Sequence, residues 1–203
     1  MRRVLLSAAL AVLRRDGAAG LTVRAITQEA GCSTTGVYTY FGGKHGLVEA
    51  IFLEGFDSFD RDVFAATAAS RPGDPGRQLL DAGRAYRRWA LANPTHYMVM
   101  FGRAVPDFVP SAVARARAQQ SFDALVAAVA ATGARDPQVN AYRLYATVHG
   151  YVMLELAGLA PDTEVERDAV YEHGLAGCAN VDEWHVELDP APGAGARREM
   201  EAS

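Results

Sequence analysis

The sequence predicts an all-α fold that is divided into two helical units. Apolar residues recur at three- and four-residue spacing through most of the 203 residues, and no segment shows the alternation of a half-buried strand. A cluster of turn-forming residues at 71–76, RPGDPG, separates the early helices from the later ones. We expect a three-helix unit over residues 1–47 and a larger unit over residues 48–178. Residues 179–203 are rich in proline, glycine and charge, which is typical of a loose tail.

The first unit begins with two helices whose limits are marked by helix-ending residues. The first helix is expected over about residues 3–15, and it ends at Asp16-Gly17. The second is expected over residues 23–30, because Thr22 is a good N-cap and Gly31 tolerates the positive φ of a helix end.

A third, short helix is expected directly after the glycine turn. We predict Ser33 as its N-cap and a helix over about residues 34–40, with Val37 and Phe41 facing inward. Two helices joined by a tight glycine turn form the helix-turn-helix plan, in which the second helix enters the major groove of DNA.

The outer face of this third helix is rich in hydroxyl groups. Threonine and glycine are poor helix formers, and glycine costs about 1 kcal/mol relative to alanine, so a helix kept only for packing would rarely carry them. Hydroxyl groups can reach phosphates and base edges, and a glycine permits close approach to DNA. An ordinary capped helix with a polar face is the alternative. The expected DNA-binding residues are Thr22, Ser33, Thr34, Thr35, Gly36, Tyr38, Thr39, Tyr40 and Lys44.

These residues have different expected roles. Thr34, Thr35 and Gly36 lie early on the helix and are expected to face bases. Tyr38, Tyr40 and Lys44 are expected to hold phosphates, since Lys44 also opens the next helix and a helix N-terminus attracts anions.

The run AGCSTTGVYTYFGGKHGL, which follows LTVRAITQE, resembles the DNA-binding domain of the TetR family of bacterial transcriptional regulators. The family pattern is matched at Thr22, Ala30-Gly31, Ser33, Tyr38, Phe41, Lys44 and Leu47. This chain departs from the family pattern at Thr27, where the family usually has alanine, and at Gly42-Gly43. The resemblance implies a homodimer that binds a palindromic double-stranded operator, with its two recognition helices about 34–36 Å apart.

The charge distribution fits a DNA-binding head on an acidic body. The whole chain carries a formal charge of −4. Residues 1–47 contain six basic and two acidic residues, a net charge of +4, which leaves −8 for the remainder. Random scatter of so few charges is the alternative.

Composition narrows the class of protein further. Cys32 and Cys178 are too few for a disulfide framework or a metal cluster, which fits a reducing cytoplasm without metal or cofactor. The opening MRRVLLSAALAVLRR superficially resembles a signal peptide, but its apolar part is short and Arg14-Arg15 closes it. No other stretch approaches the roughly 18 to 20 apolar residues of a membrane span, so no membrane association is expected.

Six further helices are expected in the remainder of the chain. Prolines, glycines and asparagine mark their ends. Their approximate limits are 44–66, 77–92, 96–103, 110–132, 136–158 and 163–176.

Two later segments resemble a C-terminal domain of TetR-type regulators that is named for a Trp-His-Gly signature. They are ANPTHYMVMFG, at 92–102, and LYATVHGYVMLELAG, at 144–158, where Tyr145 takes the tryptophan place before His149-Gly150. The resemblance implies ligand sensing and dimerisation. His149 is more often a hydrogen-bonded core histidine at such a place, and a cavity-lining role is the alternative.

Large apolar side chains are more numerous in the second unit than a minimal core requires. Such residues can surround a cavity for a hydrophobic or aromatic small molecule, and a plain core is the alternative. The candidates for ligand binding are Phe52, Phe56, Tyr86, Trp89, Tyr97, Phe101, Phe122, Tyr145, His149 and Met153. The candidates for a dimer surface are Leu144, Val148, Leu154, Leu156 and Leu175.

The family resemblance implies a homodimeric repressor released from its operator by an effector, and the apolar candidates for the cavity favour a small, hydrophobic effector. Two alternatives stay open: a DNA-binding regulator without a ligand response, and a helical ligand-binding protein or enzyme. The sequence has no nucleophile elbow, no HExxH and no metal-spaced Cys/His set. Pairs such as His96 with Asp107, or His149 with Glu155, are not singled out for acid–base chemistry, so we do not expect an enzyme.

Overall fold

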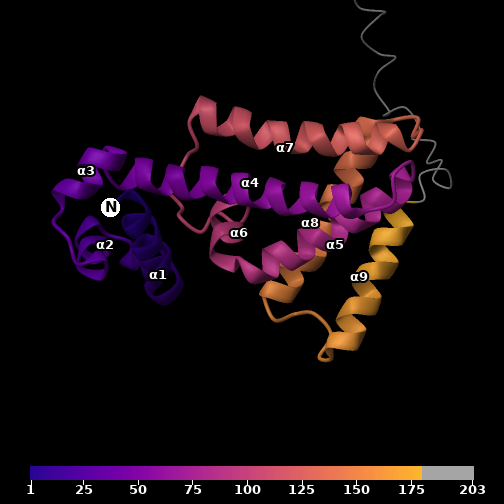
Figure 1. Cartoon of the computed structure of the whole chain (residues 1–203). Coiled ribbons are helices and arrows are strands. Elements are labelled where there is room, and N and C mark those ends of the chain that lie inside the picture. Colours follow the sequence, from indigo (N-terminus) through magenta and orange to yellow (C-terminus); the bar gives the residue numbers. More distant parts are fainter. Residues whose placement is uncertain (180–203) are drawn as a thin grey trace, which may run out of the picture.

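The computed structural model describes residues 1–179, and this part of the chain forms nine α-helices and no strand (Figure 1). The all-α prediction is confirmed. Helices α1 (Arg2–Gly20), α2 (Val23–Ala30) and α3 (Thr35–Phe41) form a head at one end of the molecule. The predicted tail, except for its first residue, lies outside the described residues.

Helix α4 (Lys44–Ala69) joins the head to the body. Its 26 residues span about 39 Å at 1.5 Å per residue. Figure 1 shows it running from the head to the opposite end of the molecule. It contacts α1 and α3 near its start and three body helices along its length, so any movement of α4 changes the position of the head relative to the body.

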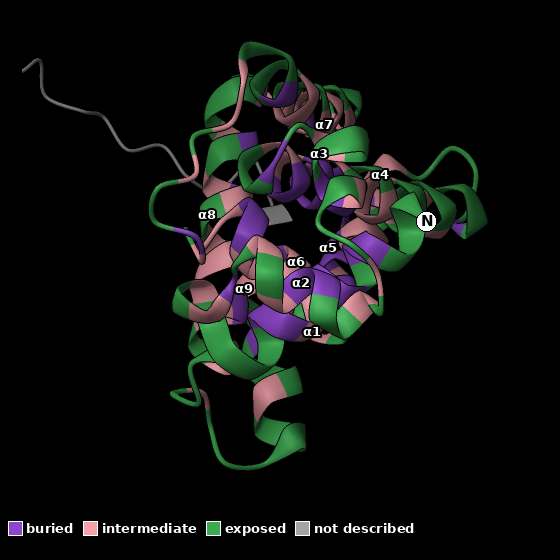
Figure 2. Ribbon diagram, turned by 90° about the vertical axis from the view of Figure 1, so that its left-hand side faces the viewer, coloured by how far each residue is buried: buried purple, intermediate pink, exposed green. Residues whose placement is uncertain are grey.

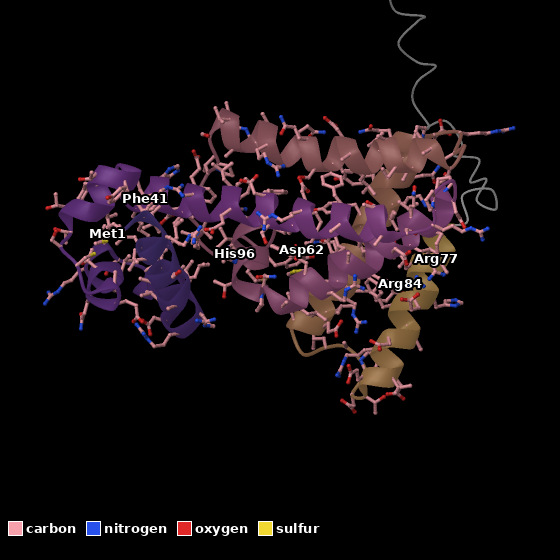
Figure 3. The ribbon with its side chains drawn as sticks, viewed as in Figure 1. Met1, Phe41, Asp62, Arg77, Arg84 and His96 are labelled. Atoms are coloured by element: carbon pink, nitrogen blue, oxygen red, sulfur yellow. The ribbon has the colours of Figure 1, made fainter. Side chains whose placement is uncertain are left out.

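The body consists of five helices packed on or beside α4. Helices α5 (Pro75–Ala92) and α6 (Pro94–Met100) lie on one side of α4, and α7 (Ala112–Ala131) runs along another side (Figure 1). Helix α8 (Pro137–Leu156) packs on α7 and α5, and α9 (Glu164–Ala179) packs on α8 and α5. Arg77 and Arg84 on α5 mark the end of the molecule remote from the head (Figure 3).

Local capping explains several of these limits. Thr22 Oγ1 accepts a hydrogen bond from Ala25 N at 3.1 Å, and Gly31 has the left-handed φ of 63° that ends α2. Asp74 and Ser111 cap α5 and α7 in the same way as Thr22 caps α2. The predicted limits of α2 and its two caps are therefore confirmed.

The prediction that Ser33 caps the third helix is wrong. Helix α3 begins at Thr35, and no side chain caps it. Thr34 already has helical backbone angles, and backbone bonds from Gly36 N to Ser33 O and from Val37 N to Thr34 O close the first turn. These carbonyl groups accept hydrogen bonds from the first N–H groups of the helix, so the Ser33 side chain is not needed as a cap.

Two other helix limits differ from the prediction. Helix α1 continues past Asp16 to Gly20, but Gly17 breaks its regular geometry with a φ of 64°. Helix α6 lies earlier than predicted and ends at Met100, because Phe101 has left the helical region and Arg103 has a positive φ of 52°.

The hydrophobic core runs continuously from the head into the body. Figure 2 shows the buried residues where helices face one another and the exposed residues on the outer surfaces. Three of the residues predicted for a dimer surface, Leu144, Val148 and Leu175, are buried inside this single chain. The structure therefore assigns these three to the core, whereas Leu154 is exposed.

Candidate DNA interface and ligand cavity

Helix α3 presents its hydroxyl groups away from the core of the head. Val37 is fully buried, whereas Tyr38 is 60% and Tyr40 48% exposed. Thr35, Tyr38 and Thr39 are spaced as on one helix face. All of the predicted DNA-binding residues are exposed except Gly36, which is half-buried. The exposed face is therefore free to meet a groove.

Gly36 is half-buried at the edge of α3 beside α1. A Cβ atom built on it would lie 3.5 Å from Leu5 Cδ1 of α1, which is an ordinary van der Waals distance. Crowding inside the head therefore does not explain why this residue is glycine. The close approach of this position to DNA stays a prediction.

The joint between α3 and α4 depends on three glycines. Gly42 and Gly43 have φ values of 69° and 129°, which other residues rarely adopt. A Cβ atom on Gly46 would lie only 1.9 Å from the carbonyl oxygen of Phe41. This close approach sets the first turn of α4, and with it Lys44, directly against the end of α3.

The basic residues of the head are not equivalent. Arg15 is held by Asp16 and Glu29, with nitrogen–oxygen distances of 2.9 and 2.8 Å. The Arg2 guanidinium carbon lies 5.3 Å from the ring centroid of the half-buried Phe41, which Figure 3 labels in the head. Lys44 is exposed and forms no ion pair with any of residues 1–179, so its charge is available to a phosphate.

A cavity of about 770 Å³ lies in the body between α4, α5, α6, α7 and α8. This volume falls within the range of sites for small molecules. Its wall includes six of the predicted ligand-binding residues, namely Phe52, Phe56, Tyr86, Phe101, Phe122 and Tyr145. The other four, Trp89, Tyr97, His149 and Met153, do not line it.

Tyr86 of the cavity wall and two polar side chains behind it, Tyr97 and His149, satisfy one another. Tyr97 Oη shares hydrogen bonds with Tyr86 Oη at 2.8 Å and with His149 Nδ1 at 2.7 Å. Burial raises the pKa of both tyrosines and lowers the pKa of His149, so all three are neutral near pH 7. His149 is therefore a hydrogen-bonded structural histidine, and its imagined partner Glu155 pairs with Arg87 instead.

Sequence reasoning missed several residues of the wall. Phe59 and Phe64 on α4 line the cavity, and so does Leu125 on α7. The spacing of Phe52, Phe56 and Phe59 follows one helix face, so extension of that periodicity along α4 would have found Phe59.

A row of aromatic rings connects the cavity to the start of α4. Phe101 and Phe56 of the wall lie with ring centroids 5.6 Å apart, and Phe56 and Phe52 lie 4.9 Å apart. Phe52 contacts Phe108 at 5.8 Å, and Phe108 contacts His45 at 5.3 Å. All of these separations are within the range for interacting aromatic pairs.

Hydrogen bonds attach the α6–α7 loop to the same part of α4. His45 Nε2 donates to the carbonyl oxygen of Val109 at 3.1 Å. The Glu49 carboxylate accepts from Ser111 N at 2.8 Å and from Ser111 Oγ at 3.0 Å. The loop that follows the cavity residue Phe101 is thus fixed to the first two turns of α4, beside Lys44.

Comparison with known proteins identifies this arrangement. Residues 5–51 match the model of the bacterial regulatory proteins of the tetR family, and residues 79–178 match the tetracyclin repressor-like C-terminal domain. The chain belongs to the TetR family. The described residues have an N-terminal helix-turn-helix and a C-terminal helical domain, as the sequence predicted.

Curated relatives of this TetR-family chain match over part of their length. The HTH-type transcriptional regulator Rv1816 of Mycobacterium tuberculosis is 30% identical over 123 residues, which are 56% of this chain and 51% of the relative. The regulator BetI of Vibrio vulnificus is 50% identical over 48 residues, 24% of each chain. The chain thus spans about half the length of the first of these relatives and a quarter of the second.

Solved structures share the fold over nearly the whole chain. A protein of unknown function from Rhodococcus sp. RHA1 has a TM-score of 0.73 at 24% identity and covers 88% of this chain and 95% of its own. The TetR-family regulator PfmR from Thermus thermophilus has a TM-score of 0.68 at 16% identity and covers 89% and 99%. Within residues 1–179, no helix is both long and apolar enough to span a bilayer.

Proposed function

We propose that this TetR-family regulator is a homodimeric repressor that a small, hydrophobic effector releases from a palindromic operator. Residues 1–47 bind DNA, and residues 48–178, a domain of the Trp-His-Gly type, bind the effector and form the dimer. The observation that carries the proposal is the 770 Å³ apolar cavity together with its contacts to the first turns of α4. A regulator without a ligand response would have no use for such a cavity.

In this proposal the DNA contacts divide by position. Thr34, Thr35 and Gly36 meet base edges at the start of α3, and Tyr38, Tyr40 and Lys44 hold phosphates. Thr22, Ser33 and Thr39 complete the interface. The exposure of the hydroxyl face of α3 supports this assignment.

Exposed apolar side chains on α8 and α9 support the dimer. Leu154 of α8 is 47% exposed and Val165 of α9 is 78% exposed, although both are large aliphatic residues. A second copy of the chain that packs on these helices would bury them and form an isologous two-fold interface.

The effector acts by favouring one separation of the two heads. It must bind the released form more tightly than the operator-bound form, because equal affinity would shift nothing. The α6–α7 loop supports such a difference, since it touches both the cavity wall and α4.

Selection of bound duplexes from a random DNA pool tests the operator part of the proposal. We expect enrichment of an inverted repeat whose half-site centres lie one helical turn apart, 10–10.5 base pairs, or a multiple of it. Enrichment of a single asymmetric site, or no enrichment at low salt, would contradict a homodimeric operator-binding protein.

A further inference from the structure

The hydroxyl group of Tyr145, which lies on the cavity wall in α8, has no hydrogen-bond partner among the described residues, 1–179. Among these residues, the only fully buried side-chain nitrogen or oxygen without a partner is His96 Nε2. The Tyr145 oxygen is therefore reached by solvent, and the cavity that Tyr145 lines provides the route.

The other phenols near the cavity differ from Tyr145. Tyr86 already shares a hydrogen bond with Tyr97, which in turn is bonded to His149. Tyr142 is 64% exposed, so bulk water can satisfy its hydroxyl group. Tyr145 is the half-buried phenol of the wall that still has a donor and an acceptor to offer.

The ring of Tyr145 is held in place by its neighbours. Its centroid lies 6.1 Å from that of Phe101, 6.2 Å from that of Phe122 and 5.6 Å from that of His149. These contacts restrict the ring, so its hydroxyl group is pre-organised for a ligand and less entropy is lost on binding.

The cavity offers no buried free charge to a ligand. Of the described lining side chains only Asp60 and Arg115 are fully charged. Asp60 accepts a hydrogen bond from Ser121 and is paired with Arg117, both at 2.8 Å. Arg115 is exposed and donates to the carbonyl group of Pro110, so solvent screens its charge. An ionic ligand would lose its hydration without gaining a buried partner.

We propose that the effector is an uncharged, flat, apolar molecule with one hydrogen-bond acceptor, such as a ketone oxygen, and that the Tyr145 hydroxyl group recognises this acceptor. The inference rests on the proposed function of the cavity as an effector site. Aromatic side chains of the wall pack against the faces and edges of the ligand. The Tyr145 hydroxyl group donates to its oxygen and so fixes its orientation.

Three matched naphthalenes serve as probes of this assignment with the full chain. 2-Acetylnaphthalene carries the acceptor, 2-isopropylnaphthalene has the same number of heavy atoms without it, and 2-naphthoate replaces the ketone with an anion. Affinities are measured by calorimetry for the wild type, Tyr145→Phe and the control Tyr151→Phe, which removes a hydroxyl group from the same helix outside the cavity wall. Phenylalanine keeps the ring contacts, and thermal unfolding of each variant verifies the fold.

We expect Tyr145→Phe to weaken binding of 2-acetylnaphthalene about fivefold, in keeping with the loss of one neutral hydrogen bond. Binding of 2-isopropylnaphthalene should not weaken, and Tyr151→Phe should change neither affinity. 2-Naphthoate should bind the wild type more weakly than the ketone does. An equal effect of Tyr145→Phe on ketone and hydrocarbon, tighter binding of the anion, or no binding of any probe would overturn the assignment.

Operator retardation by the ligand-free protein is measured separately. If the ligand-free protein does not bind an operator, the proposed function is wrong, whereas a ketone-specific effect of Tyr145→Phe would still support recognition by this hydroxyl group. Failure of the proposed function and failure of the Tyr145 assignment are therefore distinguishable.

Discussion

At the residue scale, pairing within the head separates the basic residues that can reach DNA from those that stabilise the fold. Lys44 is exposed at the first position of α4, where the helix dipole also favours an anion. Arg15 is equally basic, but Asp16 and Glu29 hold its guanidinium group and raise its pKa above the ordinary value for arginine. Only the first of these two charges is available to release a counterion from DNA.

Replacement of Lys44 by alanine should weaken binding to every DNA sequence and reduce the salt dependence of affinity. The logarithmic salt slope should fall by about one per protomer, because one phosphate contact is lost. Fluorescence anisotropy with a labelled operator at several salt concentrations measures the slope. Arg15→Ala is the matched control and should leave the slope unchanged. An unaltered slope in Lys44→Ala would count against the phosphate role.

At the element scale, the junction of α3 and α4 decides how the recognition helix is presented. The backbone of Gly46 lies against the carbonyl group of Phe41, whereas Gly36 has room for a methyl group beside Leu5. Glycine is therefore present at these two positions for different physical reasons. Packing requires glycine at Gly46, whereas glycine at Gly36 is consistent with an external surface that must come close to DNA.

Gly46→Ala and Gly36→Ala should have opposite effects on stability. At Gly46 the added methyl group collides with rigid backbone, which should cost about 1–3 kcal/mol of unfolding free energy or more. At Gly36 alanine favours the helix by about 1 kcal/mol. Chemical denaturation measures both. A Gly46→Ala protein as stable as the wild type would disprove the packing requirement.

Operator binding by the stable Gly36→Ala protein then tests the role of this glycine at DNA. If the backbone of α3 must approach the groove closely, affinity should fall at least tenfold although the fold is intact. Undiminished affinity would remove Gly36 from the interface.

At the scale of the whole molecule, α4 and the α6–α7 loop connect the cavity to the head. Phe108 lies on the α6–α7 loop, and in the aromatic row it stands between Phe52 of the cavity wall and His45. The His45–Val109 and Glu49–Ser111 hydrogen bonds fix the same loop to α4. In the proposed mechanism, repacking of the wall around a ligand shifts the first turn of α4 through these contacts.

Phe108→Leu should therefore reduce the coupling between effector and operator. Leucine keeps an apolar side chain in place but removes the ring contacts to Phe52 and His45. We expect operator affinity of the free protein within about threefold of wild type, and a smaller loss of operator affinity when a cavity-binding compound is added. Anisotropy titrations with and without a compound found by thermal-shift screening measure this difference.

The control for this substitution is Val113→Ala, which alters an exposed neighbour on α7 and should leave the response to the compound intact. Full release of the operator by Phe108→Leu would contradict transmission through the aromatic row.

Local features of the sequence were sufficient to predict much of this protein. Helix α2 begins and ends as predicted because Thr22 and Gly31 act on their own neighbouring backbone groups. The all-α class and the exposed hydroxyl face of α3 follow from periodicity, which is also local. The family was recognisable because its motif lies in one continuous stretch.

Only the tertiary structure decided which side chains of equal hydrophobicity belong to the cavity, the core or the outer surface. Tyr145 lines the cavity while its neighbour His149, one helical turn later, is bonded to Tyr97 behind the wall. Leu144 is buried and Leu154 exposed on the same helix. The physical reason is that burial depends on which other helix packs on a given face, and the amphipathic pattern of one helix does not encode the identity of its neighbours.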